Sequence, residues 1–125
     1  MAPRKRVLLV DDHAAIRAAV KLVLATDVEF EVCGEAENGR IGIEKAVALK
    51  PDLIVLDLSM PVMNGLEAAR VLRSVLPDVP ILMYTSYATS NLATEARAAG
   101  VSRVATKSSP PALIRDMQMV FKAAA

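Results

Sequence analysis

Acidic, hydroxyl and lysine side chains follow four separate apolar runs of this 125-residue sequence. Asp11 and Asp12 follow the first run, Asp57 follows a later one, and Thr85 and Lys107 come after two more. Carboxylates gathered in one place raise each other's pKa unless a cation compensates their charge. Mg²⁺ is the natural partner of such a group, because it binds a few carboxylates together with water and phosphate oxygens.

A lysine and a hydroxyl beside these acids would complete a site for phosphate chemistry. Lys107 could neutralise phosphoryl oxygens, and Thr85 could hydrogen-bond to them. With Asp57 as the nucleophile, the set suits transfer of a phosphoryl group to a carboxylate. Each residue also has an ordinary alternative, since Asp12 or His13 could cap a helix and Lys107 could be a solvated charge. Capping, however, does not require a lysine opposite three acids.

Five short runs rich in Val, Ile and Leu predict the β-strands that would position these residues. Two runs, residues 7–10 and 53–56, are unbroken apolar, as expected of central parallel strands that are covered on both faces. The predicted strands are residues 6–10, 30–35, 53–56, 81–84 and 103–106.

Apolar residues at helical spacing fill the segments between the runs. Pro51 and Pro77 follow two of these segments and Gly100 ends another, as expected of helix ends. The predicted helices are residues 13–24, 40–49, 66–76, 90–99 and 111–122.

Strict alternation of strand and helix predicts an α/β fold with a five-stranded, doubly wound parallel sheet and five helices. Ligands of such folds bind beyond the carboxyl ends of the strands, so the acids, Thr85 and Lys107 should meet at one rim. The helix predicted at 90–99 carries an apolar stripe of alanines at 93, 96, 98 and 99. A stripe of this kind buries little area, so we expect the helix to shift at low cost.

The composition suits one compact domain with an aliphatic core, because 54% of the residues are hydrophobic and only 3% are aromatic. A net charge of +1 gives no reason for attraction to nucleic acid or to an anionic membrane. The single cysteine, Cys33, is interpreted as a small buried hydrophobic residue. No apolar run reaches about 18 residues, so we expect no membrane span and a cytoplasmic location.

The motifs around these residues resemble the receiver domains of two-component response regulators. The similarity rests on Val-Asp-Asp at 10–12, on Leu-Asp-Leu-Ser-Met-Pro at 56–61 with Asn-Gly at 64–65, and on Thr85 and Lys107 after apolar runs. It covers residues 5 to 122, so residues 1–125 are expected to form a single receiver domain of flavodoxin-like fold. The run at 34–39 is most similar to receivers that precede a helix-turn-helix DNA-binding domain.

The resemblance implies a role for each matching residue. Asp57 corresponds to the phosphoacceptor, which attacks a phosphohistidine on a sensor histidine kinase or a phosphotransfer protein. Lys107 corresponds to the lysine that pairs with phosphoryl oxygens, and Thr85 to the hydroxyl that moves toward them on activation. The chain would accept a phosphoryl group rather than act as a turnover enzyme.

The resemblance also implies a Mg²⁺ site. Asp12 and Asp57 correspond to direct ligands, and Asp11 to a carboxylate that acts largely through water. Ser59 corresponds to the position that lends its backbone carbonyl to the metal.

Two positions depart from the family pattern. Val104 stands where the family often has an aromatic residue that turns inward with the threonine, so that coupling is not expected here. Tyr84 or Tyr87 could replace it, although the favoured interpretation packs Tyr84 in the core and leaves Tyr87 on the surface, where its bulk could slow hydrolysis of the phosphoryl group. Ser108 replaces the usual proline after Lys107, so a trans peptide is expected, since a non-proline cis bond costs about 3 kcal/mol.

Two rival classes of function stay open. A phosphatase of haloacid-dehalogenase type also uses an aspartate, Mg²⁺ and a lysine, but its nucleophile lies on the first strand in an Asp-x-Asp arrangement. A degenerate receiver would be an interaction module that works without phosphorylation, and Val104 and Ser108 keep that alternative open. We expect no direct contact with nucleic acid or membrane, and the sequence leaves the kinase, the output, a following DNA-binding domain and pairing into a homodimer undecided.

Overall fold

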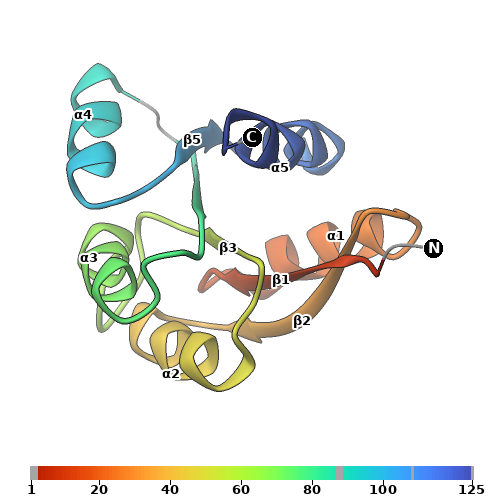
Figure 1. Ribbon diagram of the computed structural model, residues 1–125, viewed down its shortest axis with the longest axis horizontal. Helices are drawn as coiled ribbons and strands as arrows, with labels where there is room; N and C mark the ends of the chain where they lie inside the picture. Colours follow the sequence, from red (N-terminus) through yellow and green to blue (C-terminus); the bar gives the residue numbers. More distant parts are fainter. Residues whose placement is uncertain (1–2, 87–88, 108, 125) are drawn as a thin grey trace.

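The computed structural model describes residues 3–86, 89–107 and 109–124, in which strands and helices alternate along the chain (Figure 1). The strands are β1 (Lys5–Val10), β2 (Phe30–Ala36), β3 (Leu53–Leu56), β4 (Ile81–Thr85) and β5 (Arg103–Thr106). The helices are α1 (Ala14–Leu24), α2 (Gly39–Leu49), α3 (Gly65–Val75), α4 (Ser90–Ala98) and α5 (Pro110–Ala124). Each predicted strand and helix is present, and no end differs from its prediction by more than two residues.

The five strands form one sheet in the order β2-β1-β3-β4-β5, and every neighbouring pair is parallel. The chain begins near the centre of the sheet at β1, moves outward to β2, and then crosses to β3, β4 and β5 on the other side. This order reverses the winding between β1 and β3, which is where such sheets bind ligands. The predicted doubly wound parallel sheet is therefore confirmed.

Helices cover both faces of the sheet (Figure 1). Alternate residues of each strand point to opposite sides, so the strands contribute to two hydrophobic clusters, one on each face. On one face, Leu9 and Val55 pack with residues of α1 and α5, among them Val20 and Met117. On the other face the core residues come from α2, α3 and α4. The core is mainly aliphatic, as predicted, with Phe30 and Tyr84 as its buried aromatic residues. No helix in the described part of the chain is long and apolar enough to cross a membrane.

The alanine stripe predicted for α4 is only partly correct. Leu92, Ala96 and Ala99 are buried, whereas Ala93 and Ala98 are exposed. Steps of four and three residues return to the same side of a helix, so 92, 96 and 99 face the sheet together. A leucine therefore contributes to the contact together with two of the four alanines.

Cys33 lies on β2, at the edge of the sheet, and is half-buried. The interpretation of a small buried residue is therefore only partly correct, because Cys33 keeps part of its surface exposed although Phe30 of the same strand is fully buried. Partial burial still raises the pKa of the Cys33 thiol, and a raised pKa disfavours the reactive thiolate.

Candidate functional site

The ends of β1 and β3 bring three aspartates together. The Asp11 amide donates to the carbonyl of Ala36 at 3.0 Å, and the Asp57 amide donates to the carbonyl of Val10 at 2.9 Å. These backbone bonds extend the sheet past its last strand residues and place both carboxylates at its rim. Asp11 and Asp57 are buried, whereas Asp12 is exposed.

Lys107 joins the two buried carboxylates from the other half of the sheet. Its ammonium nitrogen lies 2.7 Å from Asp11 Oδ2 and 3.1 Å from Asp57 Oδ1, and its side chain is only 6% exposed. The Lys107 amide also donates to the carbonyl of Thr85 at 2.7 Å, which ties the end of β5 to the end of β4. The predicted convergence of Asp11, Asp12, Asp57 and Lys107 is therefore present, and Lys107 is not a solvated charge.

The three buried charges perturb one another in different directions. Burial, together with the charge of Asp11, raises the pKa of Asp57 above its ordinary value, and Lys107 only partly opposes the rise. Burial also acts to raise the pKa of Asp11, but hydrogen bonds from Lys107 and His13 outweigh it and hold that pKa low. Burial acts to lower the pKa of Lys107, but the two carboxylates outweigh it and raise that pKa. One lysine therefore does not compensate both carboxylates.

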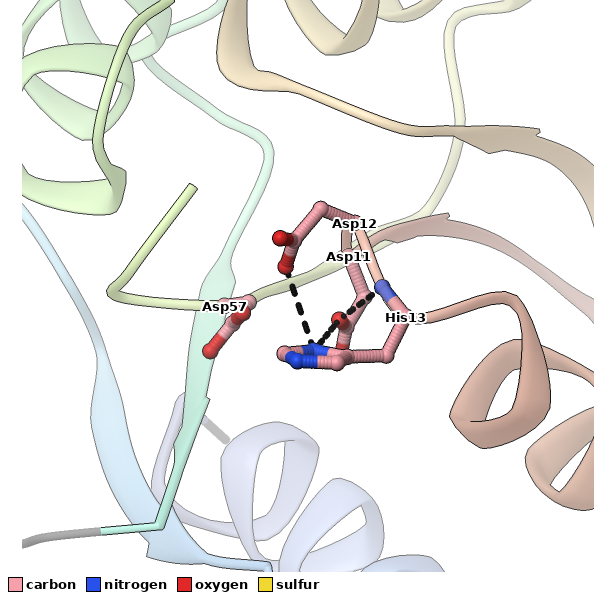
Figure 2. A group of neighbouring side chains, drawn as sticks. All are labelled: Asp11, Asp12, His13 and Asp57. Atoms are coloured by element: carbon pink, nitrogen blue, oxygen red, sulfur yellow. Dashed lines mark hydrogen bonds and ion pairs between the residues drawn. The ribbon is translucent and has the colours of Figure 1, made fainter. Parts of the chain in front are cut away.

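Asp57 carries the feature that fits a divalent cation. Its Oδ2 atom is buried, and no group in the described part of the chain hydrogen-bonds to it. Ligand atoms of Asp11, Asp12, His13 and Asp57 lie within 4.8 Å of one another (Figure 2). A buried oxygen without a partner is costly unless an ion or water satisfies it, and several carboxylate oxygens at this spacing are a donor set for Mg²⁺.

The loop after Asp57 is held by a helix cap and a glycine. Asn64 accepts from the Glu67 amide and Glu67 accepts from the Asn64 amide, which makes a capping box at the start of α3. The Gly65 amide donates to the carbonyl of Leu58 at 2.7 Å. A Cβ atom on Gly65 would lie 2.3 Å from the backbone oxygen of Asp57, so only glycine lets α3 start this close to the site.

The remaining predicted residues have mixed outcomes. Thr85 is buried at the end of β4, and Tyr84 is buried in the core as predicted. Ser59 lies exposed in the loop two residues after Asp57, and its backbone role stays a prediction. Val104 is half-buried and packs against the face covered by α2, α3 and α4. The expectations for Tyr87 and Ser108 lie outside the described residues.

His13 belongs to the site, although the sequence interpretation considered it only as a helix cap. It occupies the cap position of α1 without a side-chain capping bond. Its Nδ1 atom lies 3.0 Å from Asp11 Oδ1 and 3.1 Å from Asp12 Oδ1. Its place directly after two acids was the signal that could have indicated this position.

Arg17 is a second residue that sequence reasoning missed. Its Nη1 donates to the backbone carbonyl of Asp11, and its Nε donates to Glu35 Oε1 at 3.1 Å. Lys21 binds the other oxygen of Glu35 at 2.9 Å. The end of β2 and the helix α1 are thereby fastened to the segment that carries Asp11 and Asp12.

Comparison with known proteins agrees with this geometry. Residues 7–118 match the family model described as the response regulator receiver domain. The chain belongs to the response regulator receiver family. In this receiver domain, the rim that holds Asp57 lies where the sheet reverses its winding.

Two curated relatives show how this receiver compares with longer regulators. It is 41% identical over 90 residues to the transcriptional regulatory protein YdfI of Bacillus subtilis (strain 168), and the alignment covers 72% of this chain and 42% of YdfI. It is 42% identical over 96 residues to the response regulator protein VraR of Staphylococcus saprophyticus, which covers 77% of this chain and 46% of VraR. The receiver thus spans about half the length of these relatives.

Solved structures share the fold over nearly the whole chain. A LuxR-family two-component response regulator from Aurantimonas sp. SI85-9A1 matches with a TM-score of 0.90 and 30% identity, covering 97% of this chain and 87% of that one. The chemotaxis protein CheY4 of Vibrio cholerae matches with a TM-score of 0.86 and 34% identity, covering 94% of this chain and 99% of that one.

Proposed function

We propose that this receiver accepts a phosphoryl group on Asp57 from a phosphohistidine of a sensor histidine kinase or a phosphotransfer protein. One observation carries the proposal. Asp57 is buried, one of its carboxylate oxygens contacts Lys107, and the other has no hydrogen-bond partner in the described chain beside Asp11 and Asp12. One paired and one unpartnered oxygen support a reactive role for this carboxylate and not only a structural one.

The transfer needs no further reactant except a proton from solvent for the donor imidazole. An oxygen of Asp57 forms a bond to phosphorus while the bond from phosphorus to the donor histidine nitrogen breaks. The electron pair stays on the donor imidazole, which takes a proton, and Asp57 becomes an acyl phosphate. Lys107 would donate to the phosphoryl oxygens as negative charge moves onto the site, which is the usual role of a fixed cation in this chemistry.

The acidic cluster would hold Mg²⁺ during this reaction. Asp12 and Asp57 are the expected direct ligands, with Asp11 acting largely through water and Ser59 through its backbone carbonyl. The ion would supply positive charge to the carboxylates and to the phosphoryl oxygens. Asp57 would benefit most, because its pKa is raised by burial and by the charge of Asp11.

Phosphorylation would change the surface formed by α4, β5 and α5. The backbone bond from Lys107 to Thr85 links the residue that contacts Asp57 to the end of β4. Movement of Lys107 toward a phosphoryl group would therefore act on β4 and β5 together, and through them on the surface of α4, β5 and α5. The receiver would act as an acceptor in the cytoplasm and not as a turnover enzyme.

Acetyl phosphate with Mg²⁺ tests the proposal, read by intact mass. The wild-type chain should gain one phosphoryl group, and Asp57→Asn should gain none. The matched control is Asp78→Asn, which alters an exposed aspartate in the turn before β4 and should retain uptake. Uptake by Asp57→Asn equal to that of the control would show that the phosphoacceptor is another residue.

A further inference from the structure

The imidazole of His13 faces the same carboxylate oxygens that would hold the cation. Its Nδ1 atom lies 3.0 Å from Asp11 Oδ1 and 3.1 Å from Asp12 Oδ1, and Figure 2 shows the ring turned toward both carboxylates. The ring hydrogen-bonds to Asp11 and makes no capping bond to α1, so the carboxylates determine its direction. Its side chain is 57% exposed, so packing does not force it into the acidic cluster.

These separations match the spacing of ligands around one metal ion. Two ligand atoms at right angles, each about 2.1 Å from an octahedral ion, lie about 3.0 Å apart. Asp11 Oδ2 is already taken by Lys107, so Oδ1 is the Asp11 oxygen that faces His13. The nitrogen and the Asp12 oxygen therefore form one potential ligand face, beside which Asp11 Oδ1 could bind a water of the ion.

A second observation, independent of His13, shows that Lys107 leaves one carboxylate oxygen of this pocket without a partner. Asp57 is 4% exposed, and its Oδ2 is buried without a hydrogen-bond partner in the described chain. Ligand atoms of His13 and the three aspartates all lie within 4.8 Å of one another. A single ion at this place could satisfy the unpartnered oxygen and the face formed with His13.

We propose that His13 is a nitrogen ligand of this cation site and that the site consequently prefers a first-row transition-metal ion such as Mn²⁺ over Mg²⁺. Mg²⁺ favours oxygen ligands and keeps several waters, whereas first-row transition metals also take imidazole nitrogen, and among them Mn²⁺ is suited to the carboxylate and water ligands that the rest of this site offers. The inference rests on the proposed function for the location of the cation, and it adds a ligand and a metal preference. His13 would thus determine which ion assists the reaction at Asp57.

Pulsed electron paramagnetic resonance of the Mn²⁺-loaded chain tests the ligand directly. The sequence contains one histidine, so in an untagged protein any imidazole ¹⁴N coupling to Mn²⁺ must come from His13. The wild type should show the coupling of a directly bound nitrogen, and His13→Ala should not. Loss of the signal on growth with ¹⁵N-histidine would confirm its origin. A wild-type spectrum without this coupling would overturn the inference.

Calorimetric titration with Mn²⁺ and with Mg²⁺ tests the preference. His13→Ala should weaken Mn²⁺ binding by at least about tenfold, since even the partners of metal ligands contribute that much to affinity. Mg²⁺ binding should stay within about twofold, because Mg²⁺ replaces a lost nitrogen with water. His13→Asn should behave like His13→Ala, because its amide can hydrogen-bond to the acids but offers no imidazole nitrogen. Equal weakening for both ions would show that His13 only orients the aspartates, and would overturn the inference.

The two proposals fail in different ways. Nitrogen coupling to Mn²⁺ without uptake of a phosphoryl group from acetyl phosphate would support His13 as a ligand and refute the phosphoacceptor function. Phosphorylation of Asp57 with Mg²⁺ but without nitrogen coupling would support the function and refute His13 as a ligand.

Discussion

The ammonium nitrogen of Lys107 lies 3.1 Å from Oδ1 of Asp57 and leaves Oδ2 of the same carboxylate without a hydrogen-bond partner in the described chain. The Asp57 carboxylate therefore has a cation at one oxygen and no hydrogen-bond partner from the described chain at the other. Lys107 lies closer to Asp11, at 2.7 Å, and this unequal sharing agrees with the lowered pKa of Asp11 and the raised pKa of Asp57.

Replacing Lys107 should destabilise the receiver. Lys107→Met leaves two buried carboxylates without their shared cation, and breaking a buried pair in this way costs about 3 kcal/mol. Urea unfolding at pH 7 without divalent metal measures the loss. The loss of unfolding free energy should become smaller on acidification, because the folded protein holds the pKa of Asp11 below its unfolded value of 3.8. The stabilisation from charged Asp11 is therefore fully present above pH 3.8 and disappears as the pH falls through the folded pKa. A loss that grows below pH 4 would contradict this account.

Removing the charge of Asp57 should stabilise the metal-free receiver. The pKa of Asp57 is raised by burial and by Asp11, so its charged form is disfavoured in the fold. This lowers the free energy of unfolding when the pH is above the folded pKa of Asp57, and has no effect when the pH is below the pKa that Asp57 has in the unfolded chain. Asp57→Asn should therefore raise the Tm at pH 7 in chelator, and the gain should fall as the pH drops. Mg²⁺ should raise the Tm of the wild type more than that of Asp57→Asn, while the exposed Asp78→Asn should change the free energy of unfolding by less than about 0.5 kcal/mol.

Gly65→Ala should damage both stability and phosphorylation. The added Cβ would lie 2.3 Å from the backbone oxygen of Asp57, where the neighbouring atoms are backbone and cannot rotate away. Overpacking of this kind costs roughly 1–3 kcal/mol, and the displaced Asp57 should react more slowly with acetyl phosphate. The control is Gly34→Ala, whose Cβ would meet the flexible end of Leu49 at 2.7 Å. Equal slowing in both variants would refute a specific role for Gly65.

Arg17→Ala should weaken cation binding without touching a ligand side chain. Arg17 donates to the backbone carbonyl of Asp11 and to Glu35, which fixes the segment that carries Asp11 and Asp12. Calorimetry should show Mg²⁺ affinity lower by about tenfold, as for other residues that orient metal ligands. Lys21→Ala is the matched control, because Lys21 also binds Glu35 but lies one turn further along α1. The prediction fails if both variants bind Mg²⁺ like the wild type.

Local patterns in the sequence were sufficient for the architecture and for most of the site. Unbroken apolar runs at 7–10 and 53–56 predict central strands because both faces of these strands are covered. Helical spacing between the runs then implies parallel strands, whose carboxyl ends share a rim. Asp11, Asp12, Asp57 and Lys107 could therefore be assigned to one site from their positions alone.

Only the tertiary structure decided how these charges are shared. The sequence does not show that Lys107 approaches Asp11 more closely than Asp57, because side-chain distances depend on the packing of loops from different strands. It likewise left His13 as a helix cap and Ala93 as a buried residue, since ring direction and helix rotation follow from neighbours distant in the chain. Periodicity specifies which elements form and in what order, whereas the pKa values, the unpartnered oxygen of Asp57 and the imidazole beside the acids arise from contacts between those elements.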